Sequence, residues 1–440
     1  MTAPQPGLPL DETPYAGLNP DTVLDALDGV GLRGDGRLIQ LNSYENRVFQ
    51  VFLEDGRVVV TKFYRPGRWS DDQIAEEHAF AAELAAHEIP VAASWPLAVE
   101  ADRERGVSVS AAAQTLARIE TPKGTYRFSV SERLGGRAPE LEDMATLEWI
   151  GRFIGRMHAV GATARFKHRQ SLDVATFGTS ARDWLLEHDV VTPETAPAWR
   201  QMVDAALDAV NEAFAKVGAL RTLRLHGDCH LGNVLWVGDG PHFVDLDDAV
   251  MGPATQDLWM LLSGDRAAMT RQLAAVLDGY ESFMDFDWRE LRLIEPLRTL
   301  RMLHHSAWIA RRWNDPAFPP AFPWFASPAY WAEQTTRLRE QIVAMAEPPL
   351  GSSLSAKQPV DAPHVSSRIV ELPALGQQGL VEQDVREVIE MCARIEPLHE
   401  RMFGIHFEDR LRLRRALSGL FQEPRQVSAH VTLFHHQAGR

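Results

Sequence analysis

The stretch LHGDCHLGNVLW at residues 225–236, with FVDLDD at residues 243–248, decides the interpretation of this chain. It contains an acid at Asp228, an amide at Asn233 and a second acid at Asp245, near the end of an apolar run. Phosphoryl transfer needs such groups, because one carboxylate accepts the proton of the attacking hydroxyl. An amide oxygen and another carboxylate hold the metal ions that neutralise the polyphosphate. The stretch therefore predicts a Mg²⁺-nucleotide site, with Asp228 and Asp245 as catalytic residues and Asn233 and Asp245 as metal ligands.

Other interpretations of the same stretch remain open. An acid in a loop and another at a strand end are common in α/β proteins, so both could be structural. His226, Asp228 and His230 alternate and could form a metal triad in an extended segment, although no distal His or Cys pair completes a zinc site. Cys229 could act as a nucleophile, although no separate orienting group is visible. The combination of three groups at these intervals favours phosphoryl transfer.

The composition limits the classes of protein to which the chain could belong. Its 440 residues have room for two or three domains, and a hydrophobic content of 45% supports a large core. No apolar run approaches the roughly 20 residues of a membrane span, and the N-terminus lacks the basic region of a secretion signal. Only two cysteines are present, which excludes a disulfide framework and favours a reducing cytoplasm. A net charge of -15 argues against non-specific nucleic-acid binding.

Strand patterns dominate the first third of the chain. Apolar runs predict strands at 38–41, 47–53, 57–64, 114–119 and 126–133, and helical patterns fall at 21–29 and 71–87. The pair Asp55-Gly56 predicts a hairpin turn in which both residues have a positive φ. Between the first two strands, Ser43 and Asn46 could donate backbone N–H groups to phosphate oxygens. The same residue types also favour an ordinary turn.

Lys62 is a charged residue inside an apolar strand, and a buried ammonium needs a partner. In a kinase, the partners are the nucleotide phosphates and a glutamate from a helix. The helix at 71–87 offers Glu77 as the expected partner, with Glu76 in reserve. The alternative is an edge strand that exposes the lysine to solvent.

A break in composition at 134–137 separates this β-rich region from a helical one. The adenine of a nucleotide is expected against this hinge, near Glu132 and Leu134. Beyond it, an apolar stripe that ends at His158 predicts a packed helix in which the histidine is structural. Asp257 opens a later helix, where it could brace the catalytic loop or be an ordinary N-terminal acid.

The pattern of elements predicts an α+β fold with a small antiparallel β lobe, a large helical lobe and a mostly helical extension. The expected parts are a mobile N-terminus (1–20), a nucleotide-binding lobe (21–134), a catalytic lobe (135–349), a linker (350–368) and an extension of unknown role (369–440). Two amphipathic helices are expected within the extension, at 381–403 and 407–421. Four arginines of the helical lobe could line a substrate groove, with solvated helix faces as the default: Arg298, Arg301, Arg311 and Arg312.

With these residues in hand, the chain resembles the bacterial stress response kinase A family, in the aminoglycoside/choline kinase-like branch of the protein-kinase fold. The interval from Asp228 to Asn233 equals that of the protein-kinase catalytic loop. The similarity extends from about residue 15 to about residue 350, through the segments 41–48, 62–66, 225–236, 243–249, 252–262 and 311–324.

The resemblance implies a two-lobed, protein-kinase-like fold. It also implies an ATP- and Mg²⁺-dependent serine/threonine protein kinase of the cytoplasm, which is monomeric, autophosphorylates and acts in stress protection. In this family, Asp228 would be the proton acceptor, Asn233 and Asp245 the Mg²⁺ ligands and Ser43 the phosphate-loop residue of the ATP site.

Two kinds of phosphotransferase fit this resemblance, because fold alone does not select the acceptor. The first transfers the γ-phosphate of ATP to Ser or Thr hydroxyls of a protein. The second phosphorylates a small molecule with an aminoglycoside, choline or homoserine-type hydroxyl. A nucleotide-binding module without transfer activity is a third possibility, but binding alone does not need Asp228. The expected partners are thus ATP and a protein substrate, without nucleic acid or membrane.

Overall fold

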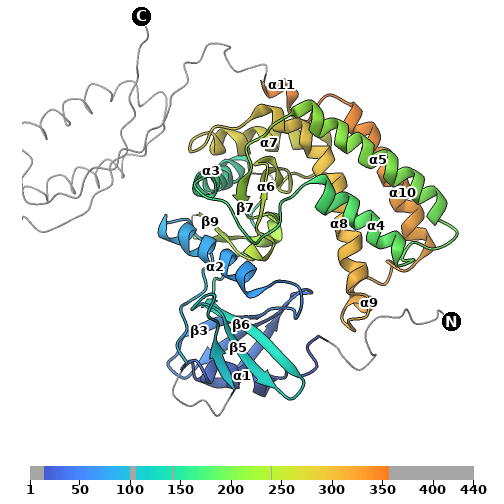
Figure 1. Ribbon diagram of the computed structural model, residues 1–440. Helices are drawn as coiled ribbons and strands as arrows, with labels where there is room; N and C mark the ends of the chain where they lie inside the picture. The colour runs from blue at the N-terminus through green and yellow to red at the C-terminus, as the bar shows by residue number, and fades with distance from the viewer. Residues whose placement is uncertain (1–13, 100–105, 141–142, 239, 356–440) are drawn as a thin grey trace, which may run out of the picture. The chain divides into compact units, whose positions relative to one another are not determined.

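A computed structural model describes residues 14–99, 106–140, 143–238 and 240–355 (Figure 1). The chain divides into two units, Met1–Lys357 and Gln358–Arg440. The second unit, with the two helices expected at 381–403 and 407–421, lies outside the described residues. The proposed division of the chain into five parts therefore stays a prediction.

One lobe of the first unit is an antiparallel sheet of six strands in the order β1-β2-β3-β6-β5-β4. The strands are β1 (Gly34–Leu41), β2 (Arg47–Leu53), β3 (Val58–Phe63), β4 (Val107–Val109), β5 (Ala117–Thr121) and β6 (Gly124–Glu132). Five of them match the predicted apolar runs, and only the short β4 was not expected. Alternate residues of β2, such as Val51 and Leu53, are buried, as the period-2 pattern requires.

Helix α1 (Pro20–Asp28) covers this sheet and completes its core. The helix begins after Asn19, whose side chain accepts the N–H of Thr22 at 2.9 Å. Leu27 packs in one cluster with the sheet residues Phe63 and Phe128. Burial of this face fixes the sheet that carries Lys62.

The hairpin between β2 and β3 differs from the prediction. Gly56 has a positive φ of 86°, but Asp55 does not. The connection spans four residues, closed by the N–H of Gly56 donating to the carbonyl of Leu53 at 3.0 Å. A longer loop needs the left-handed conformation at one position only, so the prediction of two such residues was wrong.

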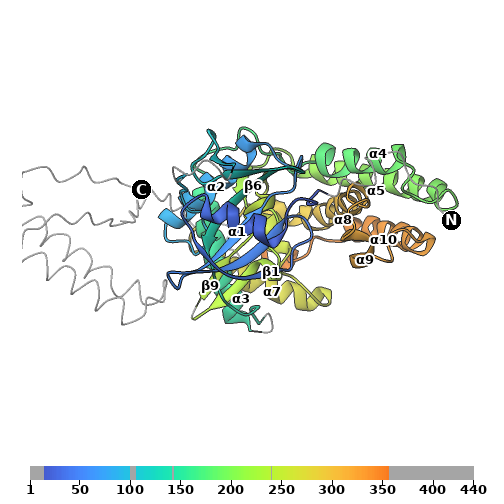
Figure 2. The same cartoon turned by 90° about the horizontal axis from the view of Figure 1, so that it is seen from below.

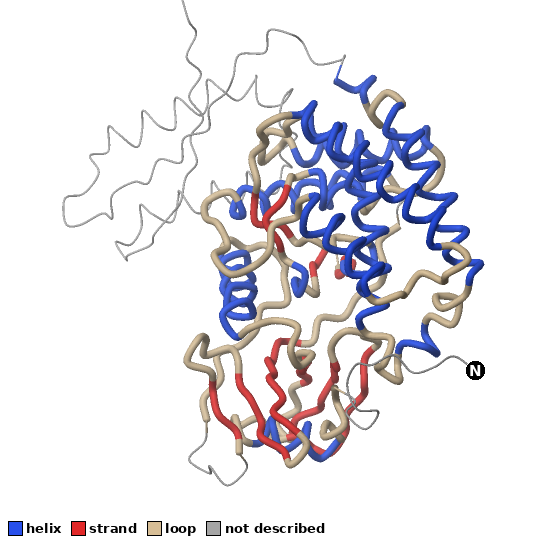
Figure 3. The backbone as a smooth tube through the Cα atoms, turned by 45° about the vertical axis from the view of Figure 1, so that its right-hand side comes forward, coloured by secondary structure: helices blue, strands red, loops and turns tan. Residues whose placement is uncertain are grey.

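Helix α2 (Asp71–Ala86) lies between the sheet and the helical lobe (Figure 3). A capping box starts it, because Ser70 accepts the N–H of Gln73 while the Gln73 side chain accepts the N–H of Ser70. The buried residues Ile74 and Phe80 anchor the helix, which presents Glu77 beneath the sheet. The helix predicted at 71–87 is confirmed, and Ser70 is its N-cap.

The second lobe is mostly helical (Figure 2). Its main helices are α3 (Met144–Gly161), α4 (Ser180–Glu187), α5 (Ala196–Val217), α6 (Thr255–Trp259), α7 (Arg266–Tyr280), α8 (Ile294–Arg311), α9 (Phe318–Ala321), α10 (Pro328–Ala346) and α11 (Ser352–Ser355). Two antiparallel two-stranded sheets pair β7 (Leu223–Leu225) with β10 (Val250–Gly252) and β8 (Val234–Val237) with β9 (Gly240–Phe243). Helices α3 and α7 pack so closely that a Cβ at Gly151 would lie 2.1 Å from the carbonyl oxygen of Val276.

The connection between the lobes is held by backbone hydrogen bonds. Arg137 and Trp236 exchange a pair, at 3.2 and 2.7 Å, and Phe243 donates to the carbonyl of Pro90 at 2.8 Å. These bonds fasten β8, which follows the catalytic loop (residues 226–233), to the hinge, and β9 to the segment after α2. The architecture confirms the predicted two-lobed α+β fold. Within the described residues, no helix has the length and apolarity needed to cross a membrane.

Candidate active site

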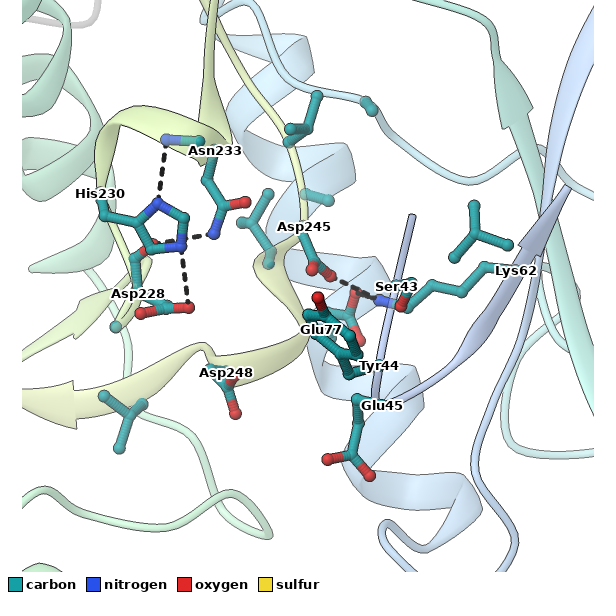
Figure 4. A pocket seen from close by; sticks show the side chains of 18 of the residues that line it. Ser43, Tyr44, Glu45, Lys62, Glu77, Asp228, His230, Asn233, Asp245 and Asp248 are labelled. Carbon is teal, nitrogen blue, oxygen red and sulfur yellow. Dashed lines mark hydrogen bonds and ion pairs between the residues drawn. The ribbon is translucent and has the colours of Figure 1, made fainter. Parts of the chain in front are cut away.

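A cavity of about 720 Å³ is lined by residues of both lobes. Its walls come from the loop between β1 and β2, the strand β3, the helix α2, the hinge, the catalytic loop and the helix α8. The side chains of Asp228, Asn233 and Asp245 all line this one space (Figure 4). The structure thus brings together the three groups that the sequence singled out.

The catalytic loop is braced from below by Asp257 of α6. This fully buried carboxylate accepts the backbone N–H groups of His226 at 2.9 Å and Gly227 at 2.8 Å. His158 Nε2 lies 3.0 Å from the same carboxylate. Burial would raise the pKa of Asp257, but the hydrogen bond with His158 and the backbone N–H groups hold it below its usual value. The bracing role expected for Asp257 and the structural role of His158 are both confirmed.

Two further residues of the loop, His226 and Gly227, are fixed by close contacts with the segment that follows β9. The buried ring of His226 places Nε2 2.9 Å from the carbonyl oxygen of Val244, immediately before Asp245. Gly227 has φ +84°, and a Cβ there would lie 2.2 Å from the carbonyl oxygen of Asp248. The loop and the segment after β9 therefore touch backbone to backbone, which sets the separation of the two acids.

Asn233 and Asp245 provide oxygen ligands for a divalent cation. The Asn233 side-chain nitrogen donates to the carbonyl of Asp228 at 2.9 Å, which leaves its oxygen free on the side of Asp245 (Figure 4). Asp245 is about half exposed and adopts the left-handed conformation, with φ 61° and ψ 61°. Mg²⁺ binds proteins through one or two such oxygens and takes its remaining ligands from water and phosphate. The donor set of this site fits Mg²⁺.

Lys62 contacts three carboxylates at once. Its Nζ lies 3.1 Å from Asp245, 3.1 Å from Asp247 and 3.6 Å from Glu77. Burial would lower the pKa of Lys62, but these carboxylates raise it well above its usual value, so the ammonium stays charged. Glu76 instead accepts three backbone N–H groups of residues 167–169, so Glu77 is the acid that faces the lysine.

Asp247 and Arg68 are central to the site, although neither was predicted from the sequence as a functional residue. Asp247 is 2% exposed and pairs with Arg68, which also contacts Asp248. Burial would raise the pKa of Asp247, but Lys62 and Arg68 hold it far below its usual value. The three acids at 245, 247 and 248 are visible in the sequence and could have indicated that a cation is needed there. The cation that neutralises it comes from a segment 179 residues away.

The predicted nucleotide contacts divide into two groups. Ser43, Glu132 and Leu134 line the cavity, as expected for residues of the phosphate loop and the hinge. Asn46 is 2% exposed, and its side chain is engaged by protein groups instead. It donates to Asp247 at 3.2 Å and accepts the N–H of Arg65 at 3.1 Å.

The loop at 42–46 has no glycine, and Glu45 holds it in place. The carboxylate of Glu45 lies 2.9 Å from Arg65 Nε, 2.6 Å from Arg312 Nε and 2.5 Å from Trp308 Nε1. Tyr44 packs on Phe322, with ring centroids 5.2 Å apart. The loop is therefore anchored to the region around α8.

The default expectation that the arginines of α8 face solvent was wrong for two of them. Arg312 pairs with Glu45, and Arg301 lines the cavity with its Nη2 2.6 Å from Asp228 Oδ1. Arg298 pairs with Glu295 on its own helix at 3.3 Å. The sequence did not distinguish Arg301 and Arg312 from the other arginines, because their partners come from distant segments.

The competing interpretations of the loop lose support. Within the described part of the chain, no group of three His, Cys, Asp or Glu residues could hold a metal ion, which argues against a triad of His226, Asp228 and His230. Cys229 is fully buried, and burial raises the pKa of its thiol well above the usual value. A buried thiol of this kind is a poor nucleophile.

Comparison with known proteins agrees with this geometry. Residues 37–294 match the sequence model of the phosphotransferase enzyme family. This chain belongs to the phosphotransferase enzyme family. Within the family, stress response kinase A of Escherichia coli (strain K12) is 46% identical over 338 residues, which are 76% of this chain and 95% of that protein. A serine/threonine protein kinase RdoA of Salmonella typhimurium is 44% identical, with the same coverage.

These relatives make the chain a kinase of the stress response kinase A family, as the sequence predicted. A solved phosphotransferase structure, amicoumacin kinase hAmiN in complex with AMP-PNP, Ca²⁺ and Ami, has the same fold with a TM-score of 0.56. It is 19% identical, and the match covers 76% of this chain and 95% of that one. The resemblance confirms the fold class.

Proposed function

We propose that this phosphotransferase is an ATP- and Mg²⁺-dependent serine/threonine protein kinase that also phosphorylates itself. It would act as a monomer in the bacterial cytoplasm during stress. The names of its relatives, stress response kinase A and serine/threonine protein kinase, support this proposal. The observation that carries the chemistry is the convergence of Asp228, Asn233 and Asp245 on one cavity wall, facing Lys62.

Each of these residues has one proposed task. Asp228 accepts the proton of the acceptor hydroxyl while the hydroxyl oxygen bonds to the γ-phosphorus and the bond to ADP breaks. Lys62, positioned by Glu77, binds phosphate oxygens of ATP. Asn233 and Asp245 hold Mg²⁺ through their oxygens. The bound cation neutralises charge on the polyphosphate, which the acidic wall alone would repel.

The remaining contacts concern the nucleotide. Ser43, in a loop anchored by Glu45, binds phosphate through its backbone N–H. Asn46 contributes through the same loop, with its side chain fixing the turn against Asp247. Glu132 and Leu134 lie at the hinge, where the adenine is expected.

The charge of the acceptor side favours a protein hydroxyl over a cationic small molecule. The α8 wall presents Arg301, His304 and His305, and burial lowers the pKa of each histidine to about 4, so both are neutral at pH 7. Among the described lining residues on this side, Glu45 is paired with arginines and Asp248 with Arg68. Aminoglycoside acceptors carry several ammonium groups, which bind through unpaired carboxylates. Asp228 alone, already paired with Arg301, offers them little.

Transfer of labelled phosphate from ATP tests the proposal. Purified protein is incubated with Mg²⁺ and labelled ATP, first with a protein acceptor and then with a panel of aminoglycosides, choline and homoserine. Labelled phosphoserine or phosphothreonine on the protein acceptor supports a protein kinase. Transfer to a small alcohol without any to protein would refute this acceptor assignment while leaving the phosphotransferase intact.

Variants test the roles within the site. Asp228→Ala should lower kcat by about 10²-fold or more, because it removes the proton acceptor. Asp245→Ala should abolish the dependence of the rate on Mg²⁺ concentration together with most of the activity. Asp183→Ala, at a half-exposed acid of α4, is the matched control and should retain the wild-type rate. Full activity in Asp228→Ala would contradict the assignment of the base.

A further inference from the structure

The catalytic loop lacks a cation of its own. Between Asp228 and Asn233 it carries Cys229, His230, Leu231 and Gly232, none of which is a lysine or an arginine. His230 lies 3.5 Å from Asp228 and is neutral unless protonated. During phosphoryl transfer, negative charge is spread over the oxygens of the transferred phosphoryl group, and a cation close to that group accelerates the reaction. A cation that stabilises this charge beside Asp228 must therefore come from another element of the fold.

Arg301 is the cation in position to do so. Among the described residues that line the cavity, Lys62, Arg68 and Arg301 are permanently cationic. Lys62 and Arg68 each contact at least two carboxylates on the nucleotide side. Arg301 instead contacts Asp228, with its Nη2 2.6 Å from Oδ1. Its side chain is 38% exposed, so the rest of its guanidinium remains open to the cavity.

We propose that Arg301 is a further catalytic residue, which binds the phosphoryl group as it passes from ATP to the acceptor. The inference rests on the proposed function, because it takes Asp228 as the base. An acceptor hydroxyl that donates to Asp228 lies about 2.7 Å from its carboxylate. Arg301 touches that same carboxylate, so the hydroxyl oxygen and the guanidinium are neighbours. The phosphorus that bonds to this oxygen therefore arrives beside the free N–H groups of Arg301.

The shape of the arginine suits this task. A guanidinium presents five N–H donors in a planar fork that matches phosphate oxygens in pairs. The contact with Asp228 uses Nη2 and leaves Nη1 and Nε as donors. As the hydroxyl proton moves to Asp228, the new O–P bond forms and ADP leaves with the electron pair of the old bond. Arg301 keeps all its protons and stabilises the charge on the equatorial oxygens.

The helix that carries Arg301 is fixed with respect to the phosphate loop. Trp308, two turns further along α8, donates to Glu45 at 2.5 Å. On the same face of α8, Leu297 and His304 also line the cavity, and the His304 ring stacks on Phe177 with centroids 4.4 Å apart. A charge held on such a support costs little reorganisation during the reaction.

The test separates binding of the transferred group from effects on the base. Aluminium fluoride with ADP and Mg²⁺ mimics the planar anionic group in flight, and its affinity is measured by calorimetry beside that of ADP alone. In Arg301→Gln, the affinity for ADP should stay within about twofold of wild type. The affinity for the fluoride complex should fall about tenfold or more. Arg298→Gln, one turn away on α8 and outside the cavity lining, should change neither.

Kinetics provide the second measurement. Arg301→Gln should lower kcat by about 10²- to 10³-fold at every pH, with the KM for ATP almost unchanged, as for loss of one transition-state donor. Arg301→Lys should recover part of the rate because it keeps the charge without the fork. Wild-type affinity of Arg301→Gln for the fluoride complex would overturn the inference. A rate loss that vanished at another pH would also overturn it, since Arg301 would then act only through Asp228.

This failure is distinguishable from failure of the proposed function. If Asp228 is the base, Asp228→Ala shows its loss of kcat whatever Arg301→Gln shows. An active Asp228→Ala variant would overturn the assigned base and, with it, the inference about Arg301. Circular dichroism of each variant, compared with wild type, shows that the chain is folded in every assay.

Discussion

Replacing Asp257 by alanine should both destabilise the protein and slow phosphoryl transfer. The carboxylate is fully buried and satisfies three donors, the backbone N–H groups of His226 and Gly227 and the ring of His158. Each buried donor left without a partner costs about 1–3 kcal/mol. Partial relaxation and entry of water reduce the sum, so the free energy of unfolding should fall by about 3–6 kcal/mol. The removal of a single side chain rarely costs more.

The effect on activity follows from the same bonds. Without them, the loop at 226–228 is free to shift, and a displacement of about 1 Å at a catalytic group can cost about 10²-fold in rate. Asp257→Asn keeps one oxygen but turns an amide group towards a backbone N–H. It should therefore lie between alanine and wild type in both stability and kcat. Asp183→Ala, at a half-exposed acid in the first turn of α4, should change the free energy of unfolding by less than about 0.5 kcal/mol.

Urea unfolding monitored by circular dichroism and steady-state kinetics measure these two effects. The pKa of Asp257 lies below its unfolded value, so its contribution to stability is fully present above about pH 4 and lost as the pH falls through the folded pKa. The difference between wild type and Asp257→Ala should accordingly be constant from pH 6 to 8 and shrink in acid. A variant within 1 kcal/mol and threefold in kcat of wild type would refute the bracing argument.

Two further results are expected. Gly227→Ala should unfold at a lower urea concentration and lose most activity, because Gly227 has a φ of +84° and a Cβ there would clash with the carbonyl oxygen of Asp248. Gly238→Ala is the control, because a Cβ at Gly238 has open space around it. It should retain activity at a smaller cost in stability. Burial raises the pKa of Glu290 to about 7 against the hydrogen bond from Thr255. The free energy of unfolding should thus fall by up to about 3 kcal/mol as the pH rises from 4.5 through 7. In Glu290→Gln, the free energy of unfolding should depend less on pH over this range. An unchanged pH dependence in the variant would exclude Glu290 as its source.

The sequence by itself determined the fold class, and it singled out the polar groups of the loop that line the cavity. The spacing of Asp228, Asn233 and Asp245 lies within one short segment, where local turns bring the groups together. The alternation of apolar and polar residues predicted the strands, since each strand must bury one face. Lys62 was expected to pair with Glu77, with Glu76 in reserve, because a charge inside an apolar strand needs a partner. The structure pairs it with Glu77, while Glu76 accepts backbone N–H groups of residues 167–169.

Only the tertiary structure decided which distant side chains complete the site. Arg68 reaches Asp247 across 179 residues, Trp308 reaches Glu45 across 263, and Arg301 meets Asp228 from helix α8. An arginine on a helix carries no local mark of its partner, because i,i+3 and i,i+4 periodicity is the same whether a charge faces solvent or a cavity. The packing of two lobes around one cavity creates the low-exposure environment in which such long-range pairs form.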